Sequence, residues 1–128
     1  MKIPIYLLGL LINVSMAWLH NQLRLAAIKK GTKAISHGWW GLLYCGLCSI
    51  PLIWIHDFYF VGSLVMVHLS AFPVALNTFA GIYPFSLSKT STAITDRMMV
   101  SLGLKDTEIV NVAAQLVSFT LLLISILK

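Results

Sequence analysis

The amino-acid sequence predicts an all-α integral membrane protein built as a four-helix bundle. The first observation is composition: 59% of the 128 residues are hydrophobic and 10% are charged, whereas a soluble domain carries roughly 25% charged residues. The second is that apolar residues gather in four long segments without Lys, Arg, Asp or Glu. The third is that no segment alternates apolar and polar residues as a membrane β-strand does. The bilayer is therefore the expected solvent for this chain.

The four apolar segments are predicted to be transmembrane helices. Each approaches the ~20 residues that a helix needs to cross ~30 Å of hydrocarbon. In hydrocarbon every backbone N–H and C=O must be bonded within the segment, and a helix achieves this. The segments cover residues 3–19, 39–55, 58–76 and 109–127. With their links they are expected to form a single polytopic membrane domain over residues 1–128.

The first segment has a competing interpretation as a secretory signal peptide cleaved after Ala17. Asn13 interrupts its apolar core, and basic residues follow soon after it. Because positive charge at that place resists export, we expect the segment to be retained as a helix.

The basic residues indicate the orientation. Two links, residues 20–38 and 77–108, hold every Lys and Arg except Lys2 and Lys128. Basic loops face the cytoplasm. The sequence therefore predicts a protein of the inner (plasma) membrane, with both links cytoplasmic and both termini outside, in the periplasm.

Only the dipeptide 56–57 joins the second and third segments, and so short a link forces an antiparallel hairpin.

The two cytoplasmic links are expected to contain helix. The first transmembrane helix is predicted to continue beyond the membrane until Gly31 stops it. In the second link, residues 92–102 predict a short amphipathic helix at the membrane surface. Ser91 or Thr92 can cap its start, and Gly103 suits its end.

Aromatic residues near the segment ends are predicted to mark the two membrane interfaces, where their rings sit among the headgroups. The outer set is Tyr6, Trp54 and Tyr59, and the inner set is Trp18, Trp39, Trp40 and Tyr83. These positions agree with the segment boundaries given above.

Cys45 and Cys48 have the Cys-x-x-Cys spacing of dithiol redox sites. In a helix, however, Gly41, Cys45 and Ser49 line up as a stripe of small residues, and such a stripe lets two helices approach closely. The redox alternative resembles the quinone-coupled thiol oxidoreductases, which are four-helix proteins that use a second cysteine pair; this sequence has two cysteines in all. Zinc needs three or four ligands. We therefore expect packing here, and no metal or cofactor.

Four polar residues lie within the apolar segments: Asn13, His68, Asn111 and Gln115. His68 is the only ionisable one, and such residues in a membrane are functional candidates by default. The alternative is that all four hydrogen-bond across helices and hold them together. We favour this second interpretation, because the second segment offers no polar residues beyond its cysteines and one serine to line a permeation path.

The sequence contains no recognisable catalytic constellation. It has no phosphate loop, nucleotide fingerprint or paired carboxylates. The remaining histidines lie at segment ends, where they are expected to be tolerated interfacial residues: His20, His37 and His56. The net charge of +5 lies at the helix ends and is explained by topology, so no nucleic-acid partner is expected.

Two stretches, residues 35–44 and 77–99, carry a family resemblance. The second has an Asn at the end of the third segment, then a Lys-Thr-Ser run and an Asp-Arg pair. The pattern resembles a diffuse group of small uncharacterised four-helix membrane proteins of Bacteroidetes and their prophages. Here Ser88 stands where that pattern has glycine, and the Asp-Arg pair comes one residue later. The resemblance implies a membrane protein encoded on a prophage or mobile element, and it implies no activity.

The same stretch holds the candidate interaction residues Lys89, Thr90, Asp96 and Arg97. Its basic side chains can bind lipid phosphate groups. Asp96 and Arg97 are also expected to pair with the first cytoplasmic link. If the protein docks a partner on its cytoplasmic face, we expect the contact here.

Taken together, these features predict a small membrane protein of structural or interaction type without catalysis. Its partners would be the bilayer and either further copies of the chain, as a homo-oligomer, or a larger membrane complex. Two alternatives stay open: transport or holin-like membrane permeabilisation through the polar residues, and thiol–quinone redox enzymology at the cysteines.

Overall fold

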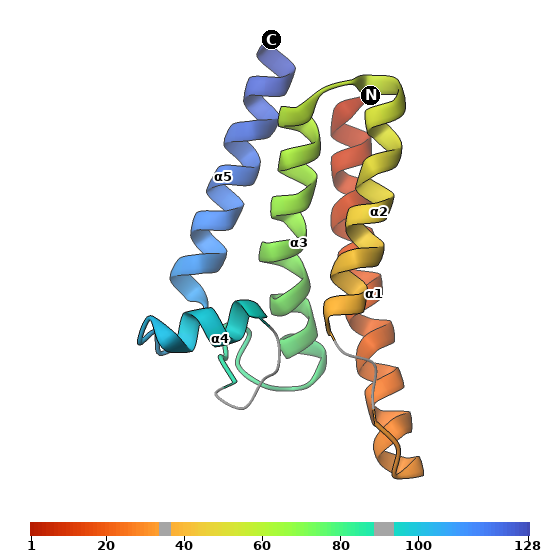
Figure 1. Ribbon diagram of the computed structural model, residues 1–128, viewed down its shortest axis with the longest axis vertical. Helices are drawn as coiled ribbons and strands as arrows, with labels where there is room; N and C mark the ends of the chain where they lie inside the picture. The colour runs from red at the N-terminus through yellow and green to blue at the C-terminus, as the bar shows by residue number, and fades with distance from the viewer. Residues whose placement is uncertain (34–36, 89–93) are drawn as a thin grey trace.

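The computed structural model describes residues 1–33, 37–88 and 94–128, which form five α-helices and, within these ranges, no strand. The helices are α1 (Lys2–Lys30), α2 (His37–Ile55), α3 (Phe58–Phe79), α4 (Ile94–Ser101) and α5 (Glu108–Leu127). All but the short α4 are long and apolar enough to cross a membrane. The predicted all-α class and its four long apolar helices are confirmed (Figure 1).

Local signals place the helix ends close to their predicted positions. α1 continues past its apolar segment and stops at Gly31, whose φ of 68° is a left-handed conformation that favours glycine. Gly103, with a φ of 76°, follows α4 in the same conformation. α4 is described from Ile94 onward, and the predicted caps Ser91 and Thr92 lie outside the described residues.

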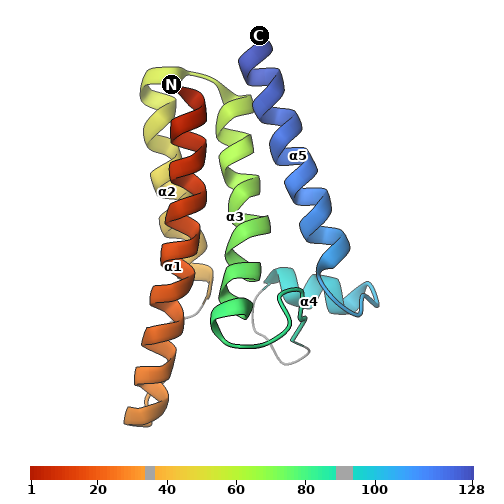
Figure 2. The same ribbon diagram turned by 180° about the vertical axis from the view of Figure 1, so that it is seen from behind.

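α3 is the central helix and packs against α1, α2 and α5. α5 lies on the side of α3 away from α2, and both views show this order (Figures 1 and 2). α4 lies across the end of the molecule where α3 ends and α5 begins. Both chain termini lie at the opposite end, beside the turn between α2 and α3. This layout puts the two long links at one end, as the predicted topology requires.

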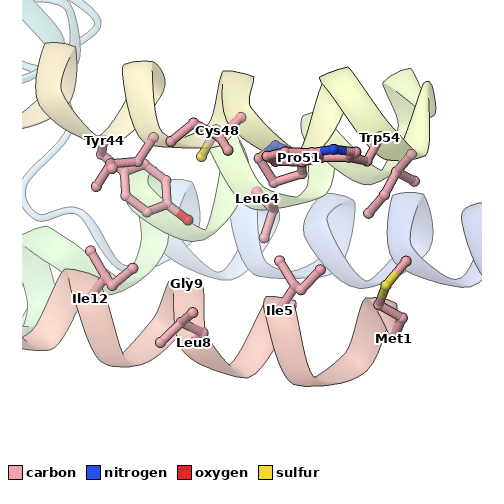
Figure 3. Close-up of a pocket in the computed structure, with 13 residues that line it drawn as sticks. Met1, Ile5, Leu8, Gly9, Ile12, Tyr44, Cys48, Pro51, Trp54 and Leu64 are labelled. Atoms are coloured by element: carbon pink, nitrogen blue, oxygen red, sulfur yellow. The ribbon is translucent and has the colours of Figure 1, made fainter.

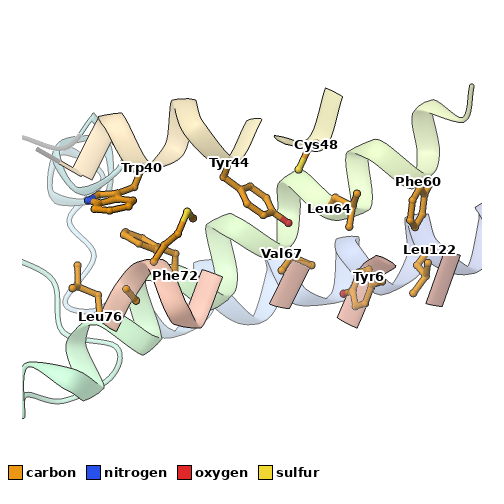
Figure 4. Close-up of a cluster of buried hydrophobic side chains, with 12 residues drawn as sticks. Tyr6, Trp40, Tyr44, Cys48, Phe60, Leu64, Val67, Phe72, Leu76 and Leu122 are labelled. Atoms are coloured by element: carbon orange, nitrogen blue, oxygen red, sulfur yellow. The ribbon is translucent and has the colours of Figure 1, made fainter. Parts of the chain in front are cut away.

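The buried core follows α3 and takes side chains from its three neighbours (Figure 4). Phe60 and Val67 of α3 are fully buried, as is Ala17 of α1, and Tyr44 reaches in from α2. Each neighbour therefore contributes its own apolar side chains to a core centred on α3.

Two aromatic residues predicted at membrane interfaces belong to the core instead. Tyr6 is 3% exposed and Trp40 is 8% exposed. The Tyr6 hydroxyl lies 2.7 Å from the Ser118 hydroxyl, and the Trp40 indole N–H donates to His20 Nδ1 over 2.7 Å. The interface prediction is wrong for these two, because nearness to a segment end does not say which face of the helix a side chain occupies. The other five are exposed: Trp18, Trp39, Trp54, Tyr59 and Tyr83.

The long helices carry apolar side chains outside and polar side chains inside. Leu42 and Leu116 are 66% and 62% exposed, whereas Asn13, Ser63 and Ser118 are fully buried. A helix on the surface of a soluble protein shows the opposite arrangement. Apolar surface of this extent is typical of interfaces with a membrane or a protein.

A buried carboxylate joins three helices at the end that holds the termini. Lys2 Nζ donates to Asp57 Oδ2 over 2.8 Å and to the Ser125 carbonyl oxygen over 2.6 Å. The Ser125 hydroxyl also donates to Asp57 Oδ2 over 2.6 Å. Asp57 Oδ1 caps α3 by accepting the backbone N–H groups of Tyr59 and Phe60. This group, which we call the Asp57 cluster, links α1, α3 and α5.

The Asp57 cluster predicts a specific dependence of stability on pH. The hydrogen bonds from Lys2 and Ser125 hold the pKa of the Asp57 carboxyl well below its usual range. Since the unfolded pKa is about 3.9, the stabilisation is complete above that pH and is lost as the pH falls below it. We expect Asp57→Asn to lower the free energy of unfolding at neutral pH by about 2 kcal/mol. The melting temperature of the micelle-solubilised variant should also decline less than that of the wild type between about pH 6 and pH 3.

Asp106→Asn is the matched control, because Asp106 accepts only an exposed backbone N–H from Glu108. The melting temperature of Asp106→Asn should fall in acid as much as that of the wild type. An Asp57→Asn protein that loses stability in acid as steeply as the wild type would contradict this role for the carboxylate.

Candidate functional site

Two of the polar residues predicted inside the apolar segments, Asn13 of α1 and His68 of α3, meet in the interior. His68 Nδ1 lies 2.6 Å from Asn13 Oδ1, and Asn13 Nδ2 donates to the Gly9 carbonyl oxygen over 2.8 Å. An amide oxygen only accepts, so the arrangement assigns a proton to His68 Nδ1. His68 Nε2 lies toward Gly41 of α2, where an added Cβ would be 3.4 Å away. The pair thus joins α1 to α3, and the ring lies beside Gly41 of α2.

Aromatic rings extend this contact along the interior. His68 stacks between Tyr44 and Phe72, with ring centroids 5.2 and 4.9 Å apart. His20 is 2% exposed and accepts the Trp40 hydrogen bond. The expectation that His20 is an interfacial residue is wrong, because α1 remains helical through this position and turns the side chain toward α2.

The other two polar candidates, Asn111 and Gln115, are four residues apart on α5 and so share one face of that helix. Gln115 Oε1 accepts from the Ser70 hydroxyl over 3.0 Å, which joins α5 to α3. Asn111 donates to the Thr107 carbonyl oxygen of its own helix over 2.9 Å, and its Oδ1 has no hydrogen-bond partner. Gln115 therefore links two helices, and Asn111 does not.

Cys45 and Cys48 are both free thiols on different faces of α2. Cys48 is 4% exposed in the core, whereas Cys45 is exposed. The prediction that Gly41, Cys45 and Ser49 form the packed face of this helix is wrong within the single chain, because Cys45 and Ser49 point outward. α2 instead turns Trp40, Tyr44 and Cys48 inward.

The candidates near α4 are not brought into one site. Lys89 and Thr90 lie outside the described residues. Asp96 and Arg97 belong to α4, none of whose residues is buried. Their predicted pairing with the link after α1 is not observed: the one ion pair in the described part of the chain is that of Lys2, at the opposite end.

An apolar pocket of about 390 Å³ lies between α1 and α2, in the half of the molecule that holds the termini (Figure 3). Its lining includes Ile5 and Ile12 from α1, Leu47, Pro51 and Trp54 from α2, and Leu64 from α3. The volume falls within the range of about 300–1,000 Å³ that small-molecule sites occupy.

Tyr44 is the buried polar residue of this pocket. Its side chain is 2% exposed, and its hydroxyl has no hydrogen-bond partner. The Cys48 thiol and the Asn13 side chain are the polar groups nearest to the hydroxyl and interact with it, but neither has good hydrogen-bond geometry to it. The oxygen lies over Gly9 of α1, where an added Cβ would approach it to 2.9 Å. Gly9 therefore makes the space that the Tyr44 ring occupies.

The sequence alone assigns Tyr44 no role. It carries one signal: this tyrosine lies inside an apolar segment, not at its end, and a buried tyrosine usually needs a partner for its hydroxyl. Its spacing of four residues from Trp40 and from Cys48 also places all three on one helical face. The contact with Gly9 could not be predicted, because it depends on how α1 and α2 dock.

Comparison with known proteins adds no assignment: the chain matches no protein-family model, no curated protein and no solved structure. Among the described residues, no group of three or more His, Cys, Asp or Glu side chains could hold a metal ion. The functional inference therefore rests on the geometry of the polar interior, the outward helix faces and the pocket.

The contact between Asn13 and His68 predicts a measurable coupling. In a double-mutant cycle with Asn13→Ala and His68→Phe, we expect an interaction energy of about 1 kcal/mol, as for hydrogen bonds between membrane helices. The measurement is reversible unfolding in mixed micelles. Asn111→Ala is the control partner for His68→Phe, because the side chain of Asn111 donates only to the Thr107 carbonyl oxygen at the start of its own helix. A coupling to His68 as large for Asn111 as for Asn13 would contradict a specific link.

Proposed function

We propose that this chain is a multi-pass membrane protein whose role is interaction and not catalysis. In this proposal the four long helices cross the plasma membrane, and α2 pairs with a second copy of the chain. The observation that carries the proposal is the distribution of side chains: the outward faces are apolar, and the polar side chains bond to one another inside. Such a surface suits lipid and helix–helix contact.

The membrane location is supported by every long helix. α1, α2, α3 and α5 have the length and hydropathy of membrane spans. Each of them presents exposed Leu, Ile, Val or aromatic side chains. The orientation follows from charge: the end that holds the two links carries most of the Lys and Arg residues, and we place that end in the cytoplasm.

Cysteine labelling tests the location and the orientation together. In a variant with Cys45 and Cys48 both replaced by Ala, we introduce either Lys128→Cys or Lys105→Cys. A membrane-impermeant maleimide should label position 128 in intact cells, and position 105 only after the membrane is permeabilised. The reverse result would overturn the orientation, and labelling of both positions in intact cells would overturn the spanning topology.

The outward face of α2 is the surface that we assign to pairing. Cys45, Gly46 and Ser49 are exposed on it, and small residues let the backbones of two membrane helices approach closely. An added Cβ at Gly46 would meet nothing within 4 Å. The chain by itself therefore does not need glycine at that position for packing.

Disulfide crosslinking tests this pairing. In Cys48→Ala, mild oxidation of native membranes should join two chains through Cys45. A disulfide needs Cα atoms within about 7 Å, and pairing through this face brings the two Cys45 residues that close. Cys45→Ala keeps only the buried thiol and should stay monomeric. Adding Gly46→Leu to Cys48→Ala should abolish the dimer while leaving the fold intact.

A control separates specific pairing from random collision. Val117 of α5 is 44% exposed, so Val117→Cys in the variant without native cysteines presents a comparable thiol on another helix. It should not crosslink. Monomer alone in the Cys48→Ala membranes, or equal crosslinking through position 117, would overturn pairing through α2.

The alternative functions find less support. A dithiol centre needs both sulfurs to reach the same substrate, but Cys48 is buried and Cys45 faces outward. A permeation path needs polar groups that remain available to the permeant, but Asn13, His68 and Gln115 are bonded to neighbouring helices.

A further inference from the structure

We infer that the pocket between α1 and α2 binds a membrane-soluble quinone-type molecule, with an apolar body and a ring carbonyl that accepts a hydrogen bond from Tyr44. The inference relies on the membrane location proposed above for the supply of such a ligand. It does not depend on the pairing of α2. Two observations carry it, the shape and lining of the pocket and the unpartnered hydroxyl at its inner end.

The buried hydroxyl of Tyr44 lacks a well-placed hydrogen-bond partner. Leaving a buried polar group unpaired costs about 1–3 kcal/mol, and Tyr44 buries its oxygen without a partner. Apart from the Cys48 thiol, a weak hydrogen-bonding group, the other lining side chains near it are apolar, among them Ile5, Ile12 and Leu64. A ligand that supplies one acceptor to this oxygen, and apolar surface elsewhere, complements the pocket.

The dimensions of the pocket fix the direction of the ligand. Tyr44 and Ile55 both line the pocket; with about 1.5 Å of rise per residue, the helix between them is about 16 Å long. This is about half of the ~30 Å of hydrocarbon in a bilayer. The pocket thus runs from one membrane surface, near Met1 and Trp54, to the middle of the membrane. The polar end of the ligand, which pairs with Tyr44, therefore lies deepest in the membrane.

This direction excludes the commonest alternative occupant. An acyl chain of a phospholipid keeps its polar group at the membrane surface and would bring a methyl group to Tyr44. The hydroxyl would then stay unpaired. A quinone carries its carbonyl oxygens on a ring at one end of an apolar tail, and the ring can lie beside Tyr44 while the tail fills the rest of the pocket.

A small side-chain movement completes the contact. The Tyr44 oxygen lies over the Gly9 backbone, and Leu64 Cδ2 is within 3.2 Å of the position of a Cβ at Gly9. Leu64 also lines the pocket. Because the Tyr44 oxygen is itself buried, the inferred contact requires Leu64 to change its rotamer so that a ligand in the pocket reaches the hydroxyl.

Thermal unfolding of the full chain in dodecyl maltoside micelles tests the inference with two matched probes. One is 2-decyl-1,4-benzoquinone, and the other is decylbenzene, which has the ring and tail but no oxygen. The quinone should raise the melting temperature in a saturable way, as ligand binding to the folded state requires, and decylbenzene should not. Tyr44→Phe should raise the half-saturating quinone concentration about fivefold, whereas Tyr59→Phe should leave it unchanged.

A second variant blocks the pocket. Leu47→Trp places a large side chain in the lining and should abolish the quinone effect, and Leu43→Trp, on α2 but outside the lining, should not. Equal stabilisation by decylbenzene would show a hydrocarbon site and overturn the inference. Unchanged quinone binding in Tyr44→Phe, or no saturable effect on the wild type, would overturn it as well. None of these outcomes bears on the Cys45 crosslink.

Discussion

Most of the buried polar side chains inside the four apolar helices hydrogen-bond to partners within the chain, and the arrangement of the helices depends on these bonds. In the membrane location that we propose, no water would replace a missing partner. The bonds recur at successive depths: the Asp57 cluster at one end, Ser118 with the Ser63 carbonyl next, then Asn13 with His68. Each of them includes α3, which explains why α3 is central and why α1 and α5 need no extensive contact with each other.

α2 is held differently, because its contacts with the other helices are made mainly by aromatic and imidazole rings. Trp40 donates to His20 at one end of α2, and Tyr44 stacks on His68 near its middle. Beyond Tyr44, toward the chain termini, no hydrogen bond between side chains ties α2 to α1 among the described residues. The space between these halves of the two helices is the pocket, with Pro51 in its wall. The ligand site thus arises where the polar ties end, and the outward face of α2 stays open to a second chain.

The sequence predicts the helices well because their signals are local. The hydrophobic runs and the glycine stops each act over a few residues, and the helix bounds in the structure follow them. It predicts the functional surfaces less well. The inward rotation of Tyr6 and His20, and the outward rotation of Cys45, depend on which helix each one faces. A one-dimensional pattern shows that residues share a face, and it does not show what that face touches.

The sequence by itself therefore determined the fold class and the number and length of the helices, and it supplied the proposed membrane topology. It could do so because hydrophobicity, charge and glycine act through composition and local backbone geometry. Only the tertiary structure decided which polar residues pair, which face of α2 is free and where the pocket lies. The physical reason is that these features come from contacts between helices distant in the sequence. The place of Tyr44 over Gly9 depends on how α1 and α2 dock, and no property of either segment alone specifies that.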